Sequence, residues 1–583
     1  MNLINSFWTG SIVLLSGVVL TAGVVQAGER RISLDDYRDR MKAAWIGQMV
    51  GVEWGAPTEF KFNDVIIPED KVPAWKPERI NGAFCNDDLY VEMTFLKTLE
   101  DHGLDAPIRQ AGIDFANSGY SLWCANAAGR ANLRKGIAPP DSSHPKFNPC
   151  PNDIDYQIEA DYSGIIAPGL PQEPIRLGKV FGRLMNYGDG VWAGQFVGAM
   201  YAEAFFTQDI DAVLDAGLAA IPAESDYAKM VRQVRAWRRE FPDDWTKAWE
   251  KIRAAYSKKF NPALKDSNGG IDVRLNGALI VLGLVYGGGD FDRSMVVSMR
   301  GGYDSDCNPS NVGGILMCMH GAKALDAKYA RALDPKRTFA YTPYDFPKLL
   351  EVCEKLARQV VVRHGGRVEK GADGKEWFVI PDAKPVPDAY VPSWRAPAPE
   401  GALFSEEEMK AQKFGRFIPD VAKLSDPDPT VRVQKALDVL CPGWKTSTNA
   451  PDMNPGYRDC VEAIQGQKMG CVFTHPPKRG EAVGISRTLK VPDGNPVLHF
   501  EVANSPHGDF RLVVRIDGDE ILKTIIGTPG SKDYRANFRP FDLSLNPWAG
   551  RTVRIELLND PTEWFCEAAF WHDIRITANS GAL

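Results

Sequence analysis

From Ser33 to about Ala332, apolar residues recur mostly with the period of an α-helix. The run begins at Ser33-Leu34-Asp35-Asp36, which has the form of a helix-capping box. The same spacing predicts further helices over residues 89–99, 194–206, 210–221, 225–241 and 273–286. We therefore expect a mainly α-helical domain over residues 28–365.

The pattern changes to a period of two near the C-terminus. Residues 497–502 and 510–516 alternate apolar and polar positions, and the turn dipeptide Asp517-Gly518 precedes another such run. Runs at 521–526, 552–558 and 568–577 complete the set. We expect an all-β, jelly-roll-like sandwich over residues 441–583, with carbohydrate binding and a structural role as its two alternatives.

The stretch between these domains, residues 366–440, has a different composition. Many prolines fall within residues 381–399, which favours a linker or an extended wrap around the helical domain. A short helix is expected within residues 420–440. This stretch is predicted to bridge the two domains.

The N-terminus has the pattern of an export signal. Residues 11–25 are apolar, and Val25-Gln26-Ala27 offers small residues where a signal peptidase cuts. A membrane anchor is the alternative, but a span needs roughly 20 apolar residues and this run is shorter. We expect a signal peptide over residues 1–27, a secreted or periplasmic protein, and no membrane association after cleavage.

Composition narrows the class of protein. The chain has 583 residues, 44% of them hydrophobic, and a net charge of −7. These values are typical of a globular protein with two or three domains and argue against a nucleic-acid partner. The ten cysteines are irregularly spaced without a Cys-x-x-Cys motif, so disulfide pairing stays open, as does the oligomeric state.

Paired carboxylates occur in two short motifs that each precede an apolar helical run. The first contains Asp87 and Asp88, and the second contains Asp304 and Asp306. One acid at each place is explained by helix capping, but two are more than capping needs. Two such charges about 4 Å apart repel by roughly 4 kcal/mol, so a cation is expected if the motifs meet. Oxygen ligands favour Mg²⁺, Mn²⁺ or Ca²⁺ over zinc.

Several segments resemble the ADP-ribosylglycohydrolase family, in the family's own order. They are the glycine-rich segment 47–59, Asn86-Asp87-Asp88-Leu89, the segment 301–307 with the helix 313–322 that follows it, and, more weakly, residues 160–170. The resemblance covers residues 33–332 and does not reach the β region. It implies a helical domain with one or two divalent metals, Mg²⁺ above all.

The resemblance also implies roles for individual residues. Metal ligands would be the four aspartates together with Asn86 and Cys307, which stand where the family has threonines. A thiol suits Mg²⁺ poorly, so the site is a working variant with one or two ions, or a remnant. The implied catalytic residues are Glu59, Asp87 and Asp304, with Glu59 as the acid/base.

Other polar residues are weaker candidates. Tyr303, Asp189 and Asn126 are expected to contact substrate, although structural roles are the alternative for each. Glu92 follows Asp88 by one helical turn and is expected behind the site or on the surface.

Three C-terminal tryptophans are candidates for stacking on sugar rings or for the sandwich core. They are Trp548, Trp564 and Trp571.

Together these features favour a secreted metal-dependent glycoside hydrolase acting on a ribosyl-like or other sugar. One alternative is a hydrolase of ADP-ribosyl groups that acts in the periplasm. Another is a catalytically inactive glycan-binding protein.

Overall fold

The structure is a computed structural model of the chain. It describes residues 28–372, 374–412, 424–458, 464–465, 470–505, 508–527, 536–562 and 566–578. The expected signal peptide, residues 1–27, lies outside the described residues.

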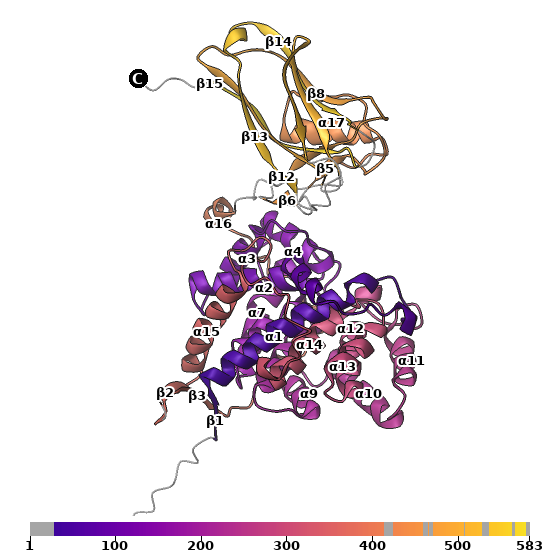
Figure 1. Cartoon of the computed structure of the whole chain (residues 1–583), viewed down its shortest axis with the longest axis vertical. Helices are drawn as coiled ribbons and strands as arrows, with labels where there is room; N and C mark the ends of the chain where they lie inside the picture. The colour runs from indigo at the N-terminus through magenta and orange to yellow at the C-terminus, as the bar shows by residue number, and fades with distance from the viewer. Residues whose placement is uncertain are drawn as a thin grey trace, which may run out of the picture.

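A helical body forms the N-terminal part of the described chain (Figure 1). Its α-helices are α1 (Leu34–Gly55), α2 (Asp87–His102), α3 (Ile108–Ala116), α4 (Cys124–Arg134), α5 (Asp155–Ile158), α6 (Asp161–Ile165), α7 (Gln172–Val180), α8 (Asp189–Ala204), α9 (Ile210–Ala219), α10 (Asp226–Glu240), α11 (Trp245–Tyr256), α12 (Val273–Gly287), α13 (Phe291–Arg300), α14 (Cys307–His320) and α15 (Phe346–Arg363). The expected helical domain is confirmed, and the predicted helices correspond to α1, α2, α8, α9, α10 and α12.

Helices α1 and α14 pack closely because glycines line their contact. A Cβ atom at Gly51 would lie 2.2 Å from the carbonyl oxygen of Pro309, and one at Gly55 would lie 1.8 Å from that of Ser305. No larger residue fits at either position without moving the backbone. Gly51 and Gly55 therefore allow the second acidic motif to pack against the end of α1.

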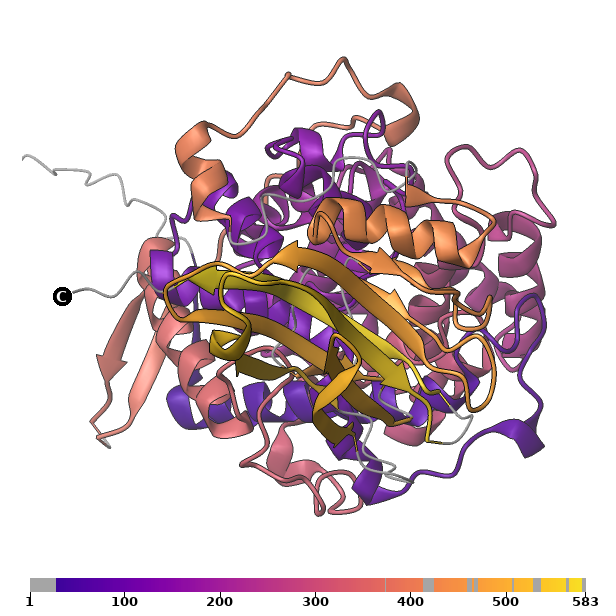
Figure 2. The same ribbon diagram turned by 90° about the horizontal axis from the view of Figure 1, so that it is seen from above.

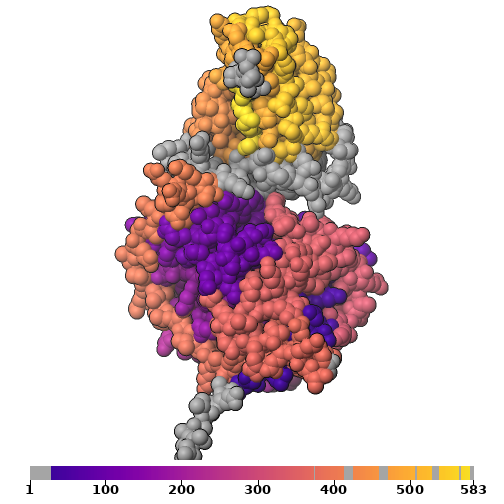
Figure 3. All heavy atoms as spheres, turned by 90° about the vertical axis from the view of Figure 1, so that its left-hand side faces the viewer, coloured from indigo at the N-terminus to yellow at the C-terminus, as the bar shows by residue number. Residues whose placement is uncertain are grey.

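Residues 366–412 pack on the helical body. Strand β3 (Glu376–Pro381) pairs with both β1 (Glu29–Ser33) and β2 (Arg367–Lys370) in a three-stranded sheet. Farther on, the Asp141 carboxylate accepts hydrogen bonds from the backbone N–H groups of residues 400–402. The short helix α16 (Glu406–Ala411) follows, and Figure 3 shows this orange segment against the purple surface of the body.

The C-terminal domain is a sandwich of two five-stranded sheets, as expected. One sheet has the order β11-β10-β14-β8-β4 and the other β13-β9-β15-β7-β5, beside a small β12-β6 pair. The strands are β4 (Lys445–Thr446), β5 (Gly456–Arg458), β6 (Ile464–Gln465), β7 (Cys471–Thr474), β8 (Val483–Lys490), β9 (Pro496–Asn504), β10 (Phe510–Ile516), β11 (Asp519–Ile526), β12 (Ala536–Asn537), β13 (Arg539–Ser544), β14 (Thr552–Asp560) and β15 (Ala569–Ala578). The five predicted strands correspond to β9, β10, β11, β14 and β15.

Helix α17 (Pro429–Leu440) belongs to the sandwich and lies beside its strands in Figure 2. Its Val433 and Leu437 are buried in the core of that domain. The bridging segment 366–440 thus contains one part that packs on the helical body and another that packs on the sandwich.

The tryptophans of the sandwich lie in different environments. Trp571 is buried in the core and donates a hydrogen bond from Nε1 to Thr474 Oγ1 at 2.9 Å, so it is not a sugar-stacking surface. Trp548 is half-buried against the same core. Trp564 lies outside the described residues. Among the helices that the structure describes, none has the length and apolar character of a membrane span.

Candidate functional site

The first acidic motif forms the N-terminus of α2. Asn86 is the N-cap residue, and its Oδ1 accepts a hydrogen bond from the backbone N–H of Asp88 at 3.0 Å. Asp87 is half-buried at the first helical position. The Asp88 side chain is fully buried, and neither carboxylate oxygen has a hydrogen-bond partner among the described residues. A buried carboxylate in this state needs a proton or a cation.

The second acidic motif is the turn that leads into α14. Tyr303 takes a left-handed backbone conformation with φ of 58°. Asp304, Asp306 and Cys307 follow it and are all buried, with possible ligand atoms within 4.8 Å of one another. Asp304 Oδ2 also has no hydrogen-bond partner in the described part of the chain.

The fold brings the two motifs together. The charge of Asp306 contributes to raising the pKa of Asp88, and the charge of Asp88 contributes to raising that of Asp304. Burial is the larger cause in both cases. We call Asp87, Asp88, Asp304 and Asp306 the acidic cluster.

Glu59 lies at the solvent edge of the acidic cluster. It follows the end of α1 and a short 3-10 turn (Ala56–Thr58), where Thr58 Oγ1 is 2.8 Å from Ser305 Oγ. Partial burial and then the charges of Asp306 and Asp87 raise the pKa of Glu59 to about 8. A carboxyl group with such a pKa carries a proton at neutral pH, which is the state of a general acid.

The central segment, residues 153–161, contributes carboxylates that the sequence motifs do not identify as site residues. Asp155 and Glu159 are buried, and the charge of Asp87 contributes to raising the pKa of each, after burial and closer neighbours. Asn126 orders both, since its backbone N–H bonds Asp155 and its side-chain amide donates to Glu159 Oε1. The signal available in the sequence was the density of acids at positions 153, 155, 159 and 161.

Glu92 is fully buried behind the acidic cluster rather than on the surface. One of its oxygens accepts a hydrogen bond from the Gln48 side chain on α1, and the other accepts from the Tyr162 backbone N–H at 2.6 Å. The carboxylate therefore joins α1, α2 and α6.

Tyr303 lies beside the acidic cluster and lines a surface hollow of about 330 Å³. Its hydroxyl donates to Asp64 Oδ1 at 2.6 Å. Phe60, Lys258 and Gly270 are among the other lining residues. The volume of the hollow lies at the small end of the range for small-molecule pockets.

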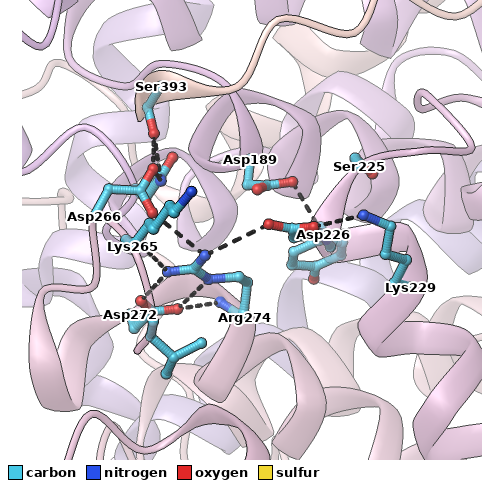
Figure 4. A network of polar contacts seen from close by, with 12 residues as sticks. Asp189, Ser225, Asp226, Lys229, Lys265, Asp266, Asp272, Arg274 and Ser393 are labelled. Carbon is cyan, nitrogen blue, oxygen red and sulfur yellow. Dashed lines mark hydrogen bonds and ion pairs between the residues drawn. The ribbon is translucent and has the colours of Figure 1, made fainter. Parts of the chain in front are cut away.

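The contacts of Asp189 lie away from the acidic cluster. Its carboxylate accepts a hydrogen bond from the Tyr227 backbone N–H at 3.0 Å, beside the buried guanidinium of Arg274 (Figure 4). Arg274 in turn pairs with Asp272 at 2.7 Å and with Asp266 at 3.4 Å. Among the described contacts none joins Asp189 to the acidic cluster, so its role in substrate binding stays a prediction.

The residues present fit a hard divalent cation. The acidic cluster offers buried oxygens without partners, at Asp88 and Asp304, which a cation would satisfy. Cys307 fits less well, because a soft thiol ligand suits Mg²⁺ poorly. Asn86 Oδ1 already accepts one hydrogen bond and retains a second lone pair for a ligand role.

Comparisons with known proteins place the helical domain in a family. A sequence profile described as ADP-ribosylglycohydrolase matches residues 33–365, which is more than half of the chain. No curated protein sequence matches the chain significantly.

Solved structures show lower similarity. One described as "ADP-ribosylglycohydrolase-related protein complex" is 15% identical with a TM-score of 0.37, covering 56% of this chain and 100% of that one. One described as "CBM4 structure and function" is 14% identical with a TM-score of 0.15, covering 24% and 99%. A Stig cyclase from Fischerella sp. TAU is 14% identical with a TM-score of 0.18, covering 24% and 87%. TM-scores this low do not establish a shared fold.

Proposed function

Because the chain belongs to the ADP-ribosylglycohydrolase family, we propose that it is a secreted, metal-dependent glycoside hydrolase with its active centre at the acidic cluster. The observation that carries the proposal is the fully buried Asp88 carboxylate, whose oxygens have no hydrogen bond of normal geometry among the described residues. The charge of Asp306 in the second motif contributes to raising its pKa, after burial and the charge of Asp87. The bond cleaved is an N- or O-glycosidic bond of a ribosyl-like or other sugar.

The proposed division of labour follows from burial and charge. A divalent cation, Mg²⁺ by preference, held by the acidic cluster supplies charge neutralisation and Lewis acidity when bound. Glu59, at the solvent edge of the cluster, gives a proton to the leaving atom as the glycosidic bond breaks. Burial is the largest cause of its raised pKa and acts with or without the cation. The same carboxylate then takes a proton from the attacking water.

The residues around the acidic cluster position the substrate. The hollow beside Tyr303 receives the sugar or the leaving group. Asn126 keeps Glu159 and Asp155 in place and acts on substrate through them. The apolar N-terminal run of residues 11–25 supports export, and export favours an extracellular glycan as the substrate.

A panel of glycans and ADP-ribosyl conjugates, assayed with and without a chelator, tests the proposal. We expect hydrolysis of a glycan to stop on chelation, to return with Mg²⁺ and to be lost in the Asp304→Asn/Asp306→Asn double variant. Asp70→Asn, at an exposed position, is the matched control and should keep full activity.

The other outcomes separate the alternatives. Cleavage confined to ADP-ribosyl conjugates would identify the periplasmic ADP-ribosyl hydrolase instead. Activity that survives both chelation and the double substitution would contradict the metal mechanism. Glycan binding without turnover or cation binding would identify an inactive glycan-binding protein.

A further inference from the structure

Two cysteines far apart in the sequence lie side by side next to the candidate site. Cys124 is the first residue of α4, and Cys150 lies in the loop before α5. Both side chains are half-buried free thiols, and their sulfur atoms lie within 4.8 Å of each other and of an Asp153 oxygen. This arrangement permits either a metal site or a disulfide.

The hydrogen bonds of Asp153 argue against the metal site. Its Oδ2 accepts from the Ala125 backbone N–H at 2.6 Å, and its Oδ1 accepts from the Asp155 N–H at 3.2 Å and from Asn186 Nδ2 at 3.0 Å. Donors already occupy three of the roughly four lone-pair sites of this carboxylate. Metal binding would compete with these hydrogen bonds, and without the carboxylate only two thiols remain, whereas zinc sites use three or four protein ligands.

We propose that Cys124 and Cys150 form a disulfide that fastens the N-terminus of α4 to the segment carrying the central carboxylates. Both sulfur atoms are near enough to meet after side-chain rotation, and both side chains are open to a small oxidant. The inference does not depend on the proposed function.

The cross-link acts on groups that surround the acidic cluster. The first turn of α4 supplies the N–H groups that bond Asp153 and Asp155, and its Asn126 side chain bonds Glu159. Joining Cys124 to Cys150 holds these donors against their acceptors. Reduction frees the two segments to separate.

The chemistry is thiol–disulfide exchange with a low-molecular-weight disulfide as the oxidant. The Cys150 thiolate attacks one sulfur of the oxidant and expels one thiolate, which gives a mixed disulfide. Cys124 then loses its proton, attacks the Cys150 sulfur and expels the second thiolate. The two cysteines lose two electrons and two protons, and the oxidant becomes two thiols.

The contact between the two thiols lowers the pKa of Cys150 to about 7, because the remaining thiol proton stabilises the thiolate. The same disulfide forms whichever of the two thiols attacks first.

Peptide mapping of the full chain tests the proposal. The protein is treated with oxidised glutathione or with dithiothreitol, alkylated, digested and analysed by mass spectrometry. We expect the oxidised sample to yield a Cys124–Cys150 peptide pair lighter than its reduced parts by two hydrogen atoms. Oxidation should also raise the melting temperature by a few degrees, because the link constrains the unfolded chain.

Variants decide between the remaining outcomes. The Cys124→Ser/Cys150→Ser double variant should melt at the same temperature with either reagent, whereas the Cys85→Ser control should keep the oxidant-dependent shift. Full alkylation of both cysteines after oxidation would overturn the proposal. So would one equivalent of Zn²⁺ bound by the reduced wild type and lost in the double variant.

Discussion

At the scale of single residues, the site is defined by carboxylates that the fold buries without neutralising. Asp88 is completely buried, and burial together with the charges of Asp87 and Asp306 raises its pKa well above the ordinary value. Glu59 differs because it reaches solvent at the edge of the cluster. Position therefore separates the groups suited to hold a cation from the group suited to move a proton.

Replacing Asp88 with asparagine should weaken cation binding without unfolding the protein. The amide has nearly the same size and carries no charge, so the cation-free protein should be as stable as the wild type or more stable. Affinity for Mg²⁺ should fall by about 100-fold or more. Removing a residue that only hydrogen-bonds to a metal ligand already costs about 10–100-fold in affinity, and Asp88 is proposed as a ligand itself. Calorimetric titration measures the Mg²⁺ affinity, with Asp70→Asn as the control. Unchanged affinity in the Asp88→Asn variant would show that Asp88 is not a ligand.

Replacing Glu59 with glutamine should affect proton transfer alone. We expect kcat on a susceptible substrate to fall by about 10²–10⁴-fold, the range for loss of a general acid or base. Mg²⁺ affinity should stay near that of the wild type. The exposed Glu78→Gln variant is the control, and a Glu59→Gln enzyme with normal kcat would exclude the proposed acid.

At the scale of elements, the site depends on how closely α1 and α14 approach. The glycines of α1 let the backbone of α14 approach to distances that a methyl group would prevent. The turn with Asp304 and Asp306 precedes α14, so its position follows from that contact. Asp161 on α6 provides a second contact to α14, because its Oδ1 accepts a hydrogen bond from the Asn311 side chain at 2.7 Å.

Replacing Gly51 with alanine tests this contact. The added methyl group would lie 2.2 Å from the Pro309 carbonyl oxygen, so α14 must move. The free energy of unfolding should fall by about 1–3 kcal/mol, and Mg²⁺ affinity should fall with it. Chemical denaturation measures the first effect. Lys42→Ala, on the exposed face of α1, should change stability by less than about 0.5 kcal/mol; equal effects at both positions would contradict the argument.

At the scale of the whole molecule, the buried carboxylates couple stability to pH and to cations. Without a cation, the pKa of Asp304 is raised to about 7 by burial and neighbouring charges, and that of Glu59 to about 8. Both values exceed those of the unfolded chain, which are about 4. The folded protein therefore holds more protons than the unfolded chain between these values.

The sign of the pH effect follows from this difference in bound protons. In chelator, the melting temperature should fall as pH rises from about 5 to about 8, because the folded state must lose protons that stabilise it. Added Mg²⁺ should reverse the trend, since it binds the deprotonated cluster and releases protons. Differential scanning calorimetry at several pH values measures both. A melting temperature that rises with pH in chelator would contradict the assignment.

The sequence by itself determined the two kinds of domain, the positions of several long helices and strands and the two acidic motifs. Helical and strand periods and cap residues are local properties, and Asn86 caps α2 just where its apolar run begins. Only the tertiary structure decided which charges meet. The burial of Asp88 beside Asp306, the place of Asp155 and Glu159 and the proximity of the Cys124 and Cys150 thiols bring together residues from different segments of the chain. Such contacts depend on how helices pack, and the spacing of residues within one segment does not encode them.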